Sequence, residues 1–297
     1  MNADLIESFR KKTLVVYSAG CGNGKSEIAA GLALCAARGG FRTWILDANT
    51  FSPAQDFIFG FSPHNPTFSD FLVDMAIAEM PVYPVNTIKN NPHPVPLFLT
   101  PSERNDPEIR FALQEALNSG ADVYSRIPGA VYAAMLREKI DLLIIDTHPS
   151  FEKTNEVWMG MAGFLLITSR INPIEFESLR ALFKDPSFSD IREKLVVFTN
   201  VQTDRSRNAT PDMANEVVVR QLKTLREQLE KDACAIACTD PPANTRVHEH
   251  PFLYSEKLAR FQQAQKRPGM FIDIEPDDGF SVNIRKLGDT VLEIIRR

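Results

Sequence analysis

A glycine-rich stretch near the N-terminus combines the residue types that bind phosphate groups. Residues 20–26 read GCGNGKS, follow an apolar run at residues 14–17 and precede a helix-like stretch at residues 27–38. Glycines let backbone N–H groups curl around an anion, and the start of the following helix adds partial positive charge. Lys25 would reach the β- and γ-phosphates of a nucleotide, and the Ser26 hydroxyl would bind Mg²⁺. The predicted nucleotide contacts in this segment are Gly20, Cys21, Gly22, Asn23, Gly24, Lys25, Ser26 and Glu27.

Two aspartates stand where apolar runs end. The run WILDAN (44–49) contains Asp47, and the run LLIIDTHP (142–149) contains Asp146. An aspartate at a strand end beside a phosphate loop suits a magnesium site, because its carboxylate can hold a metal-bound water while a hydroxyl and phosphate oxygens bind the ion. Either aspartate would otherwise be a helix N-cap or a turn residue. We favour the metal role and predict a site made by Ser26, Asp47 and Asp146.

Short apolar runs alternate with helical periodicity along most of the chain. Continuous apolar runs are typical of parallel strands buried on both faces, and this alternation predicts a doubly wound α/β fold with a mostly parallel sheet between two layers of helices, as in P-loop NTPases. We expect a single domain over residues 1–297, with a helical extension at 1–12 and irregular segments at 80–96 and 239–281. The predicted strands are Leu14–Ser18, Thr43–Asp47, Leu97–Thr100, Leu142–Asp146, Phe164–Thr168, Leu195–Asn200 and Ala233–Cys238.

Composition narrows the class of protein. The chain has 297 residues, 44% of them apolar and 24% charged, with a net charge of −5, which does not favour nucleic acid or an anionic membrane. The longest nearly uninterrupted apolar stretch, Ala29 to Ala37, is too short to span a bilayer. The first residues lack the apolar core of a signal peptide. We therefore expect a cytoplasmic protein.

The order of these motifs resembles the MinD/ParA family of P-loop ATPases from about Leu14 to Asp240. The resemblance implies an ATP-dependent dimer that acts as a spatial switch for a cargo such as a plasmid, a chromosome, a division site or a protein body. It also implies that Asn200 contacts adenine, that Pro241 lies on the other side of the base, and that residues 146–149 form switch II. The matching segments are GNGKS, ILDANTFSPAQDFIFGF, LFLTPSE, IDLLIIDTHP, FLLITSRINPIEFESLRAL and LVVFTN.

Two positions depart from the family pattern. Gly20 stands where the family has a signature lysine that crosses the dimer interface; Lys153 and Arg170 are candidate replacements, although solvated surface charges are the simpler interpretation for both. Asn49 stands where the family has an aspartate that orients or activates the attacking water. An amide can hydrogen-bond a water but cannot accept its proton, so we expect slow or absent hydrolysis. The resemblance implies a catalytic set of Lys25, Asp47, Asn49 and Asp146.

Several cysteine and histidine residues allow a functional or an ordinary interpretation. Cys21 lies in the positive field of the loop and could be a redox switch, but we prefer an inert small residue. Cys234 and Cys238 are too far apart on a strand to share a metal, and we interpret them as reduced, buried thiols. Residues 248–250 (His-Glu-His) could clip a metal but fit a polar loop better. His148 could replace the missing catalytic group through its imidazole, although we favour a turn residue.

The C-terminal part of the chain offers two further surfaces. Residues 282–297 are amphipathic, and we expect their apolar stripe to pack on the fold rather than bind a membrane, because the segment has few aromatic and cationic residues. A small basic cluster could touch DNA nonspecifically, but a solvated helix face is the preferred interpretation. The stripe contains Ile284, Leu287, Val291, Leu292 and Ile295, and the cluster contains Lys257, Arg260, Lys266 and Arg267.

Three functions remain open at this level. The first is an ATP-binding switch ATPase with ATP/ADP and Mg²⁺ as ligands, a nucleotide-dependent homodimer and a protein partner. The second is a degenerate, non-catalytic relative that serves as a nucleotide-binding scaffold or regulatory module. The third is a metabolic P-loop enzyme that phosphorylates or ligates a small molecule. It would need a substrate pocket from residues 80–96, for which the sequence has no signature.

Overall fold

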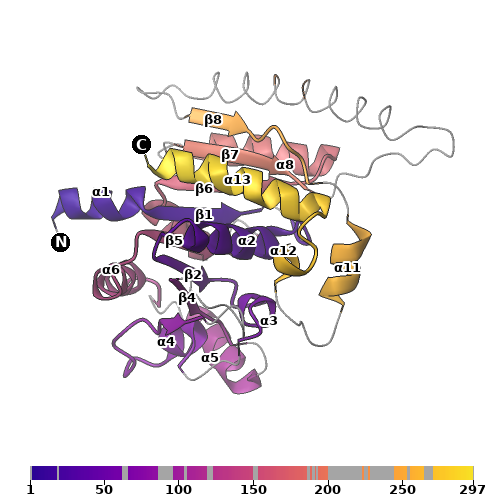
Figure 1. The fold of residues 1–297 in the computed structure, drawn as a ribbon. Coiled ribbons are helices and arrows are strands. Elements are labelled where there is room, and N and C mark those ends of the chain that lie inside the picture. The colour runs from indigo at the N-terminus through magenta and orange to yellow at the C-terminus, as the bar shows by residue number, and fades with distance from the viewer. Residues whose placement is uncertain are drawn as a thin grey trace, which may run out of the picture.

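The fold is built around a central β-sheet with helices on both faces (Figure 1). It is seen here in a computed structural model. The residues that the structure describes are 2–18, 20–61, 66–85, 96–103, 106–118, 123–149, 153–185, 188, 191, 193–199, 223, 227, 244–252, 255–263 and 270–296.

Strands and helices alternate along much of the chain. The strands are β1 (Thr13–Tyr17), β2 (Thr43–Asp47), β3 (Tyr83–Pro84), β4 (Leu97–Thr100), β5 (Leu142–Asp146), β6 (Phe164–Ser169), β7 (Glu193–Phe198) and β8 (Asn244–Val247). The helices are α1 (Ala3–Lys11), α2 (Lys25–Arg38), α3 (Gln55–Ile58), α4 (Phe68–Val73), α5 (Pro107–Asn118), α6 (Ile127–Arg137), α7 (Lys153–Met161), α8 (Pro173–Lys184), α11 (Glu256–Gln262), α12 (Phe271–Ile274) and α13 (Gly279–Ile295).

The sheet has the order β3-β4-β2-β5-β1-β6-β7-β8, and only the short β3 pairs antiparallel to its neighbour. Strand β1 lies between β5 and β6, so the loop after β1 starts in the middle of the carboxyl edge of the sheet. In the register of β2 with β5, Asp47 lies directly opposite Asp146. Ligands of doubly wound sheets bind at this edge, and the aspartates predicted at strand ends lie there.

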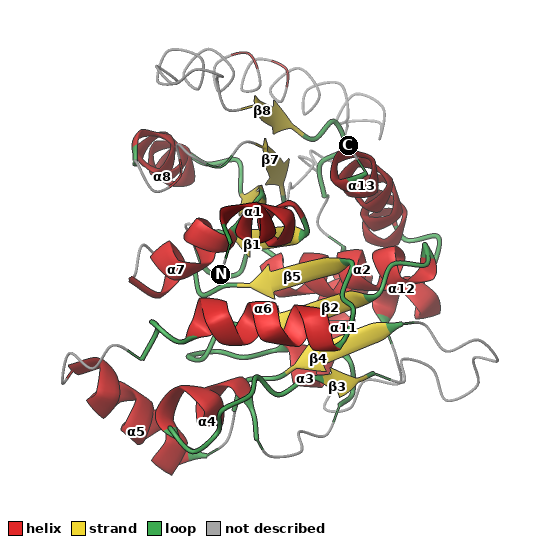
Figure 2. Cartoon of the chain, turned by 90° about the vertical axis from the view of Figure 1, so that its left-hand side faces the viewer, coloured by secondary structure: helices red, strands yellow, loops and turns green. Residues whose placement is uncertain are grey.

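Helix α8 lies on one side of the sheet and α13 on the other (Figure 2), and each face of the sheet has its own apolar cluster. Alternate residues of β1 show the division, since Val15 and Tyr17 belong to one cluster while Leu14 and Val16 belong to the other. The first cluster also holds buried residues of α1, α4, α6, α7 and α8, and the second those of α2, α12 and α13. Helices on both faces explain why the central strands are continuous apolar runs. The prediction of a doubly wound, mostly parallel α/β sheet is confirmed.

The predicted strands agree closely with the observed ones. Three have the predicted bounds, and β1, β6 and β7 differ at their ends by one or two residues. The predicted strand at 233–238 lies outside the described residues, as does much of the segment at 80–96, where Tyr83–Pro84 forms β3. The segment 239–281, expected to be irregular, instead contains β8, α11 and α12. Strand β8 reads NTRV at the sheet edge and has no apolar run that periodicity could detect.

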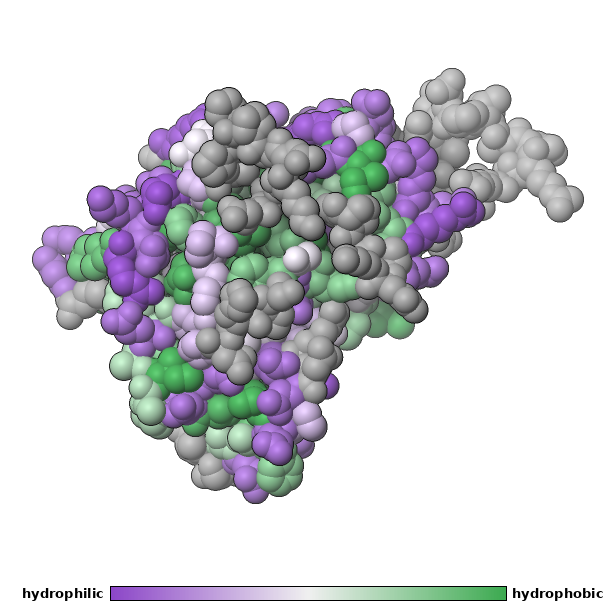
Figure 3. All heavy atoms as spheres, turned by 60° about the horizontal axis from the view of Figure 1, so that its bottom comes forward, coloured by the Kyte–Doolittle hydropathy of each residue, from purple (hydrophilic) through white to green (hydrophobic). Residues whose placement is uncertain are grey.

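The amphipathic C-terminal segment forms α13, which packs on α2. Four residues of the predicted stripe are buried, whereas Ile295 is half-buried. Ile284 reaches so close to Gly31 of α2 that a Cβ there would lie 2.8 Å from its Cγ2 atom. No helix within the described residues is long and apolar enough to cross a membrane. On the face drawn in Figure 3, apolar residues form patches that hydrophilic residues interrupt.

Candidate nucleotide-binding site

The loop between β1 and α2 has the backbone of an anion-binding turn. Gly22 and Gly24 have φ values of 71° and 69°, in the left-handed region that favours glycine. Helix α2 starts at Lys25, and the Gly24 carbonyl accepts the N–H of Ile28 at 3.0 Å. The N–H groups of the first turn of this 14-residue helix have no acceptor within the helix itself, which is the arrangement that binds anions.

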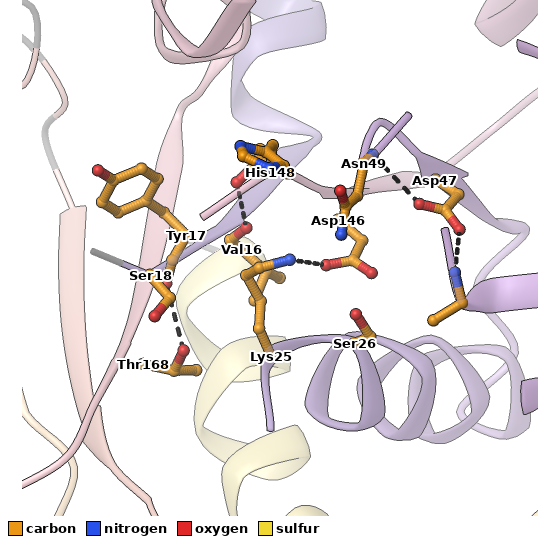
Figure 4. Close-up of polar contacts among 12 residues, drawn as sticks. Val16, Tyr17, Ser18, Lys25, Ser26, Asp47, Asn49, Asp146, His148 and Thr168 are labelled. Atoms are coloured by element: carbon orange, nitrogen blue, oxygen red, sulfur yellow. Dashed lines mark hydrogen bonds and ion pairs between the residues drawn. The ribbon is translucent and has the colours of Figure 1, made fainter. Parts of the chain in front are cut away.

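Lys25 holds a buried ion pair at the head of the loop (Figure 4). Its Nζ atom lies 2.5 Å from Oδ1 of Asp146, and both side chains are almost fully excluded from solvent. The other oxygen of Asp146 accepts a hydrogen bond from Nε2 of Gln55 at 2.7 Å. The same Gln55 nitrogen donates to the backbone carbonyl of Ser26 at 3.0 Å. The aspartate at the end of β5 is thus tied both to the loop lysine and to the segment after β2.

Asp47 faces the backbone of the segment after β2. Its Oδ2 atom accepts the N–H groups of Ala54 and Gln55 at 2.9 and 3.0 Å, and its Oδ1 atom accepts that of Asn49 at 3.2 Å. Burial, and then the charge of Asp146, raise the pKa of the Asp47 carboxyl to about 7, although the N–H groups of Gln55 and Ala54 oppose the shift. Asp47 therefore organises the loop at 49–55, and its direct role toward a metal or the reaction stays a prediction.

The residues around Ser26 fit a magnesium ion. The Ser26 hydroxyl has no hydrogen-bond partner among the described residues, so it is available as a ligand. Asp146 supplies a carboxylate nearby, and Oε1 of the fully buried Gln55 lacks a partner within the described part of the chain. A buried orphan acceptor beside a hydroxyl and a carboxylate is what a metal-bound water would satisfy.

Gln55 was not among the predicted site residues. A lone glutamine belongs to no motif that predicts phosphate or metal chemistry, and its contacts run to residues 29 and 91 positions away. The sequence clue to Gln55 was its position shortly after Ser52–Pro53 in the second motif. Its N–H group bonds to Asp47 in the folded chain.

Asn49 is engaged in a turn. Its Nδ2 atom donates to the carbonyl of Ser52 at 2.8 Å, while its Oδ1 atom accepts the Ser52 N–H at 3.1 Å. The residue still lines the cavity in front of the phosphate loop. Both ends of the amide are therefore committed to the loop.

A cavity of about 450 Å³ opens directly onto the phosphate loop. Residues 20–28 form one wall, and α11 forms another through Leu258, Ala259 and Gln262. Gln262 also lies 3.4 Å from Oε1 of Glu27. This volume is in the range of small-molecule sites.

Some predicted residues lie elsewhere or outside the described part. Asn200, Pro241, Cys234, Cys238, Lys266, Arg267 and the side chain of Lys153 lie outside the described residues. His148 lines the cavity, and its ring lies against that of the half-exposed Phe51, with ring centres 4.9 Å apart. Arg170 reaches its own phosphate loop, where it donates to the carbonyls of Cys21 and Gly22.

His248 and His250 lie close together after β8. The rings of His248 and His250 lie 5.6 Å apart, and within the described residues no three side chains of His, Cys, Asp or Glu are placed to hold a metal. His248 is buried, whereas Glu249 is exposed. Burial, and then the positive charge of His250, lower the pKa of His248 to about 4.

We expect the buried His248 to make the protein less stable in mild acid. Its pKa is lower in the folded state than the ordinary 6.5, so the unfolded chain binds the proton more tightly. Its contribution to stability is complete above pH 6.5 and is lost as the pH falls towards 4, which amounts to about 2 kcal/mol between pH 7 and pH 5. Urea unfolding at both pH values checks this. His248→Gln should reduce the difference between them, and an unchanged difference would exclude His248 as its source.

Comparisons with known proteins agree with this fold. No protein-family model matches the chain, and no curated protein matches it. Solved structures do: an ATP complex of a McdA variant from Cyanothece has a TM-score of 0.62 at 21% identity and covers 96% of both chains. MinD in the MinC:MinD complex of Aquifex aeolicus gives 0.63 at 16% identity, covering 95% of this chain and 96% of that one. MinD with Mg-ADP from Pyrococcus horikoshii gives 0.58 at 13%, covering 94% and 95%.

The chain therefore has the fold of the MinD/ParA P-loop ATPases, and the resemblance first found in its motifs is confirmed at the level of the fold. Within that fold, the phosphate loop, Lys25 and Asp146 meet at the carboxyl edge of the sheet, in front of a cavity.

Proposed function

We propose that this protein is an ATP-binding switch ATPase of the MinD/ParA kind. The observation that carries the proposal is the buried pair of Lys25 and Asp146 at a glycine-rich loop that opens onto a cavity. Burying two charges costs desolvation free energy, so this pair is weak evidence for stability alone. A lysine held beside an anion-binding backbone is suited to phosphate. The similar structures include complexes of other proteins with ATP and with Mg-ADP, which supports the same ligand class here.

The chain's own groups divide the work of binding. Backbone N–H groups of residues 20–26 would surround the phosphates, and Lys25 would exchange its contact with Asp146 for one with phosphate oxygens. Ser26 would hold Mg²⁺, and Asp146 with Gln55 would orient its water; when bound, the ion neutralises charge on the phosphates. Asp47 keeps the loop at 49–55 in place through its backbone contacts.

Hydrolysis is proposed to be slow. Asn49 cannot accept a proton, and both ends of its amide already bind Ser52. Binding of ATP, rather than its turnover, would then be the main signal, with the segments at 49–56 and 147–156 changing contacts between states. We propose a homodimer with ATP and a protein partner, in the positioning or assembly of a cellular cargo.

A non-catalytic scaffold is the second candidate. The glycine at position 20 and the committed amide of Asn49 favour it, because neither can supply the chemistry that the family pattern places there. The two candidates differ in whether nucleotide changes the assembly of the protein.

Light scattering with no nucleotide, with ADP and with ATP plus Mg²⁺ tests the proposal. A monomer that becomes a dimer only with ATP would support the switch. A solution mass that is the same with and without nucleotide, combined with tight ATP binding in a direct assay, would favour the scaffold. Absence of any ATP binding would overturn both.

A further inference from the structure

The junction between β6 and α8 contacts the back of the phosphate loop through Glu175. Its Oε2 atom accepts Nδ2 of Asn23 at 2.8 Å and the backbone N–H of Arg170 at 2.7 Å. The N–H of Glu175 is itself capped by Oδ1 of Asn172 at 2.9 Å, which places the carboxylate in the first turn of α8. One carboxylate thus links the loop to the start of a helix from a distant part of the chain.

Asn23 brings the loop to this carboxylate from the other side. Its side chain is almost fully buried, and Nδ2 also lies 2.7 Å from Oγ of Ser18 at the end of β1. A charge-assisted hydrogen bond from a buried amide to a carboxylate is stronger than a neutral one. Asn23 is therefore held between the end of β1 and α8.

Arg170 fixes the peptide planes of the loop. Its Nη2 atom donates to the carbonyl of Gly22 at 2.7 Å and to that of Cys21 at 3.3 Å. In a trans peptide the carbonyl and the following N–H point in opposite directions, so these contacts aim the N–H groups of Gly22 and Asn23 away from the guanidinium. Residues 20–28 line the cavity, whereas Arg170 is not among the described residues that do. The N–H groups are thereby directed to where an anion would bind.

Glycines at positions 20 and 22 leave room for the side chains of Glu175 and Arg170. A Cβ at Gly22 would lie 2.7 Å from Nη2 of Arg170, and a Cβ at Gly20 would lie 3.2 Å from Oε1 of Glu175. The space beside position 20 is thus occupied by the carboxylate of α8. The absence of a side chain at Gly20 leaves room for Glu175.

We infer that Arg170 and Glu175 are positioning residues of the phosphate loop: Arg170 orients its peptide groups toward the nucleotide phosphates, and Glu175 holds Arg170 and Asn23 in place. This inference rests on the proposed function, since it takes the loop to bind a nucleotide. Arg170 thus acts on the phosphate loop of the same chain, whereas the sequence had favoured a solvated surface charge.

The test compares affinities of the full-length protein for a fluorescent ADP analogue with Mg²⁺. Arg170→Ala should raise Kd by roughly 10- to 100-fold, because it removes hydrogen bonds from a charged donor to two carbonyls. Arg170→Lys should recover part of the affinity, since a lysine can supply one such donor. Arg180→Ala is the matched control, because Arg180 lies on α8 and pairs with Glu177 away from the loop.

A double-mutant cycle separates positioning from a general loss of stability. Glu175→Gln and Asn23→Val should each weaken binding by about 10-fold, and together by less than the product, because they share one contact. Thermal unfolding without nucleotide should differ little between Arg170→Lys and the wild type.

The outcomes distinguish this inference from the proposed function. Wild-type binding with an unchanged Kd for Arg170→Ala would overturn the positioning role and leave the nucleotide site standing. Loss of binding in Arg170→Ala without recovery in Arg170→Lys, together with lower unfolding temperatures for both, would assign Arg170 a purely structural role. Absence of wild-type binding would overturn the proposed function and this inference with it.

Discussion

We expect Lys25→Ala to lower affinity for ATP and ADP by at least about 100-fold. The reason is that the variant loses the one cationic side chain among residues 20–26 of the loop. The same change leaves the buried Asp146 without its cation and next to Asp47 in register. Removing one partner of a buried ion pair is destabilising by about 3 kcal/mol. Isothermal titration with Mg-ATP and urea unfolding at pH 8 measure the two effects.

A compensating variant separates binding from stability. Lys25→Met combined with Asp146→Asn removes both charges, so it should recover most of the lost stability without recovering nucleotide binding. The pH provides a second control. Asp47 already has a pKa of about 7 because of burial and the Asp146 charge, and loss of Lys25 raises it further. Lys25→Ala should therefore lose less stability at pH 6 than at pH 8, because the Asp47 carboxyl takes up a proton at the lower pH. Full nucleotide affinity in the double variant would contradict the role given to Lys25.

Asn49→Asp should accelerate ATP hydrolysis by about 10- to 100-fold. An aspartate can accept a proton from the attacking water, which asparagine cannot. It also loses the Nδ2 donor, so a carboxylate oxygen would face the carbonyl of Ser52 across 2.8 Å and the turn would release the side chain toward the cavity. We expect the loss of this hydrogen bond to lower the free energy of unfolding by about 1 kcal/mol. Phosphate release from purified protein under single-turnover conditions measures the rate.

Asn49→Ala is the matched control for this result. Like the aspartate variant it loses the donor to the Ser52 carbonyl, and it also loses the acceptor for the Ser52 N–H. It offers no proton acceptor to the attacking water, so its hydrolysis should stay at the wild-type level. A rate that rises equally in both variants would show that freeing the loop, rather than a new base, limits hydrolysis. An Asn49→Asp rate that does not rise would place the limiting feature elsewhere, such as at Gly20. The Lys25→Ala background corrects for contaminating ATPases.

Most strands of the central sheet could be predicted from the local pattern of apolar residues. Short apolar runs such as the one in Leu142–Asp146 predicted strands, because strands buried on both faces show no alternation of apolar and polar residues. β8 and α11 escaped prediction because an edge strand and a short solvent-facing helix carry polar residues, and their stability comes from contacts with β7 and from a capping serine. Asn200 and Pro241, predicted to meet the base, remain predictions.

The phosphate loop and the aspartates at the strand ends could be predicted from the sequence alone, because glycine spacing and an apolar run are local properties of the chain. The partners of those residues are seen only in the folded chain. Lys25 and Asp146 are 121 positions apart, and Asn23 and Glu175 are 152 apart. No local pattern specifies such contacts, because they follow from the order of strands in the sheet, which places β1 between β5 and β6. That order brings Asp146 to the lysine and the start of α8 to the back of the loop.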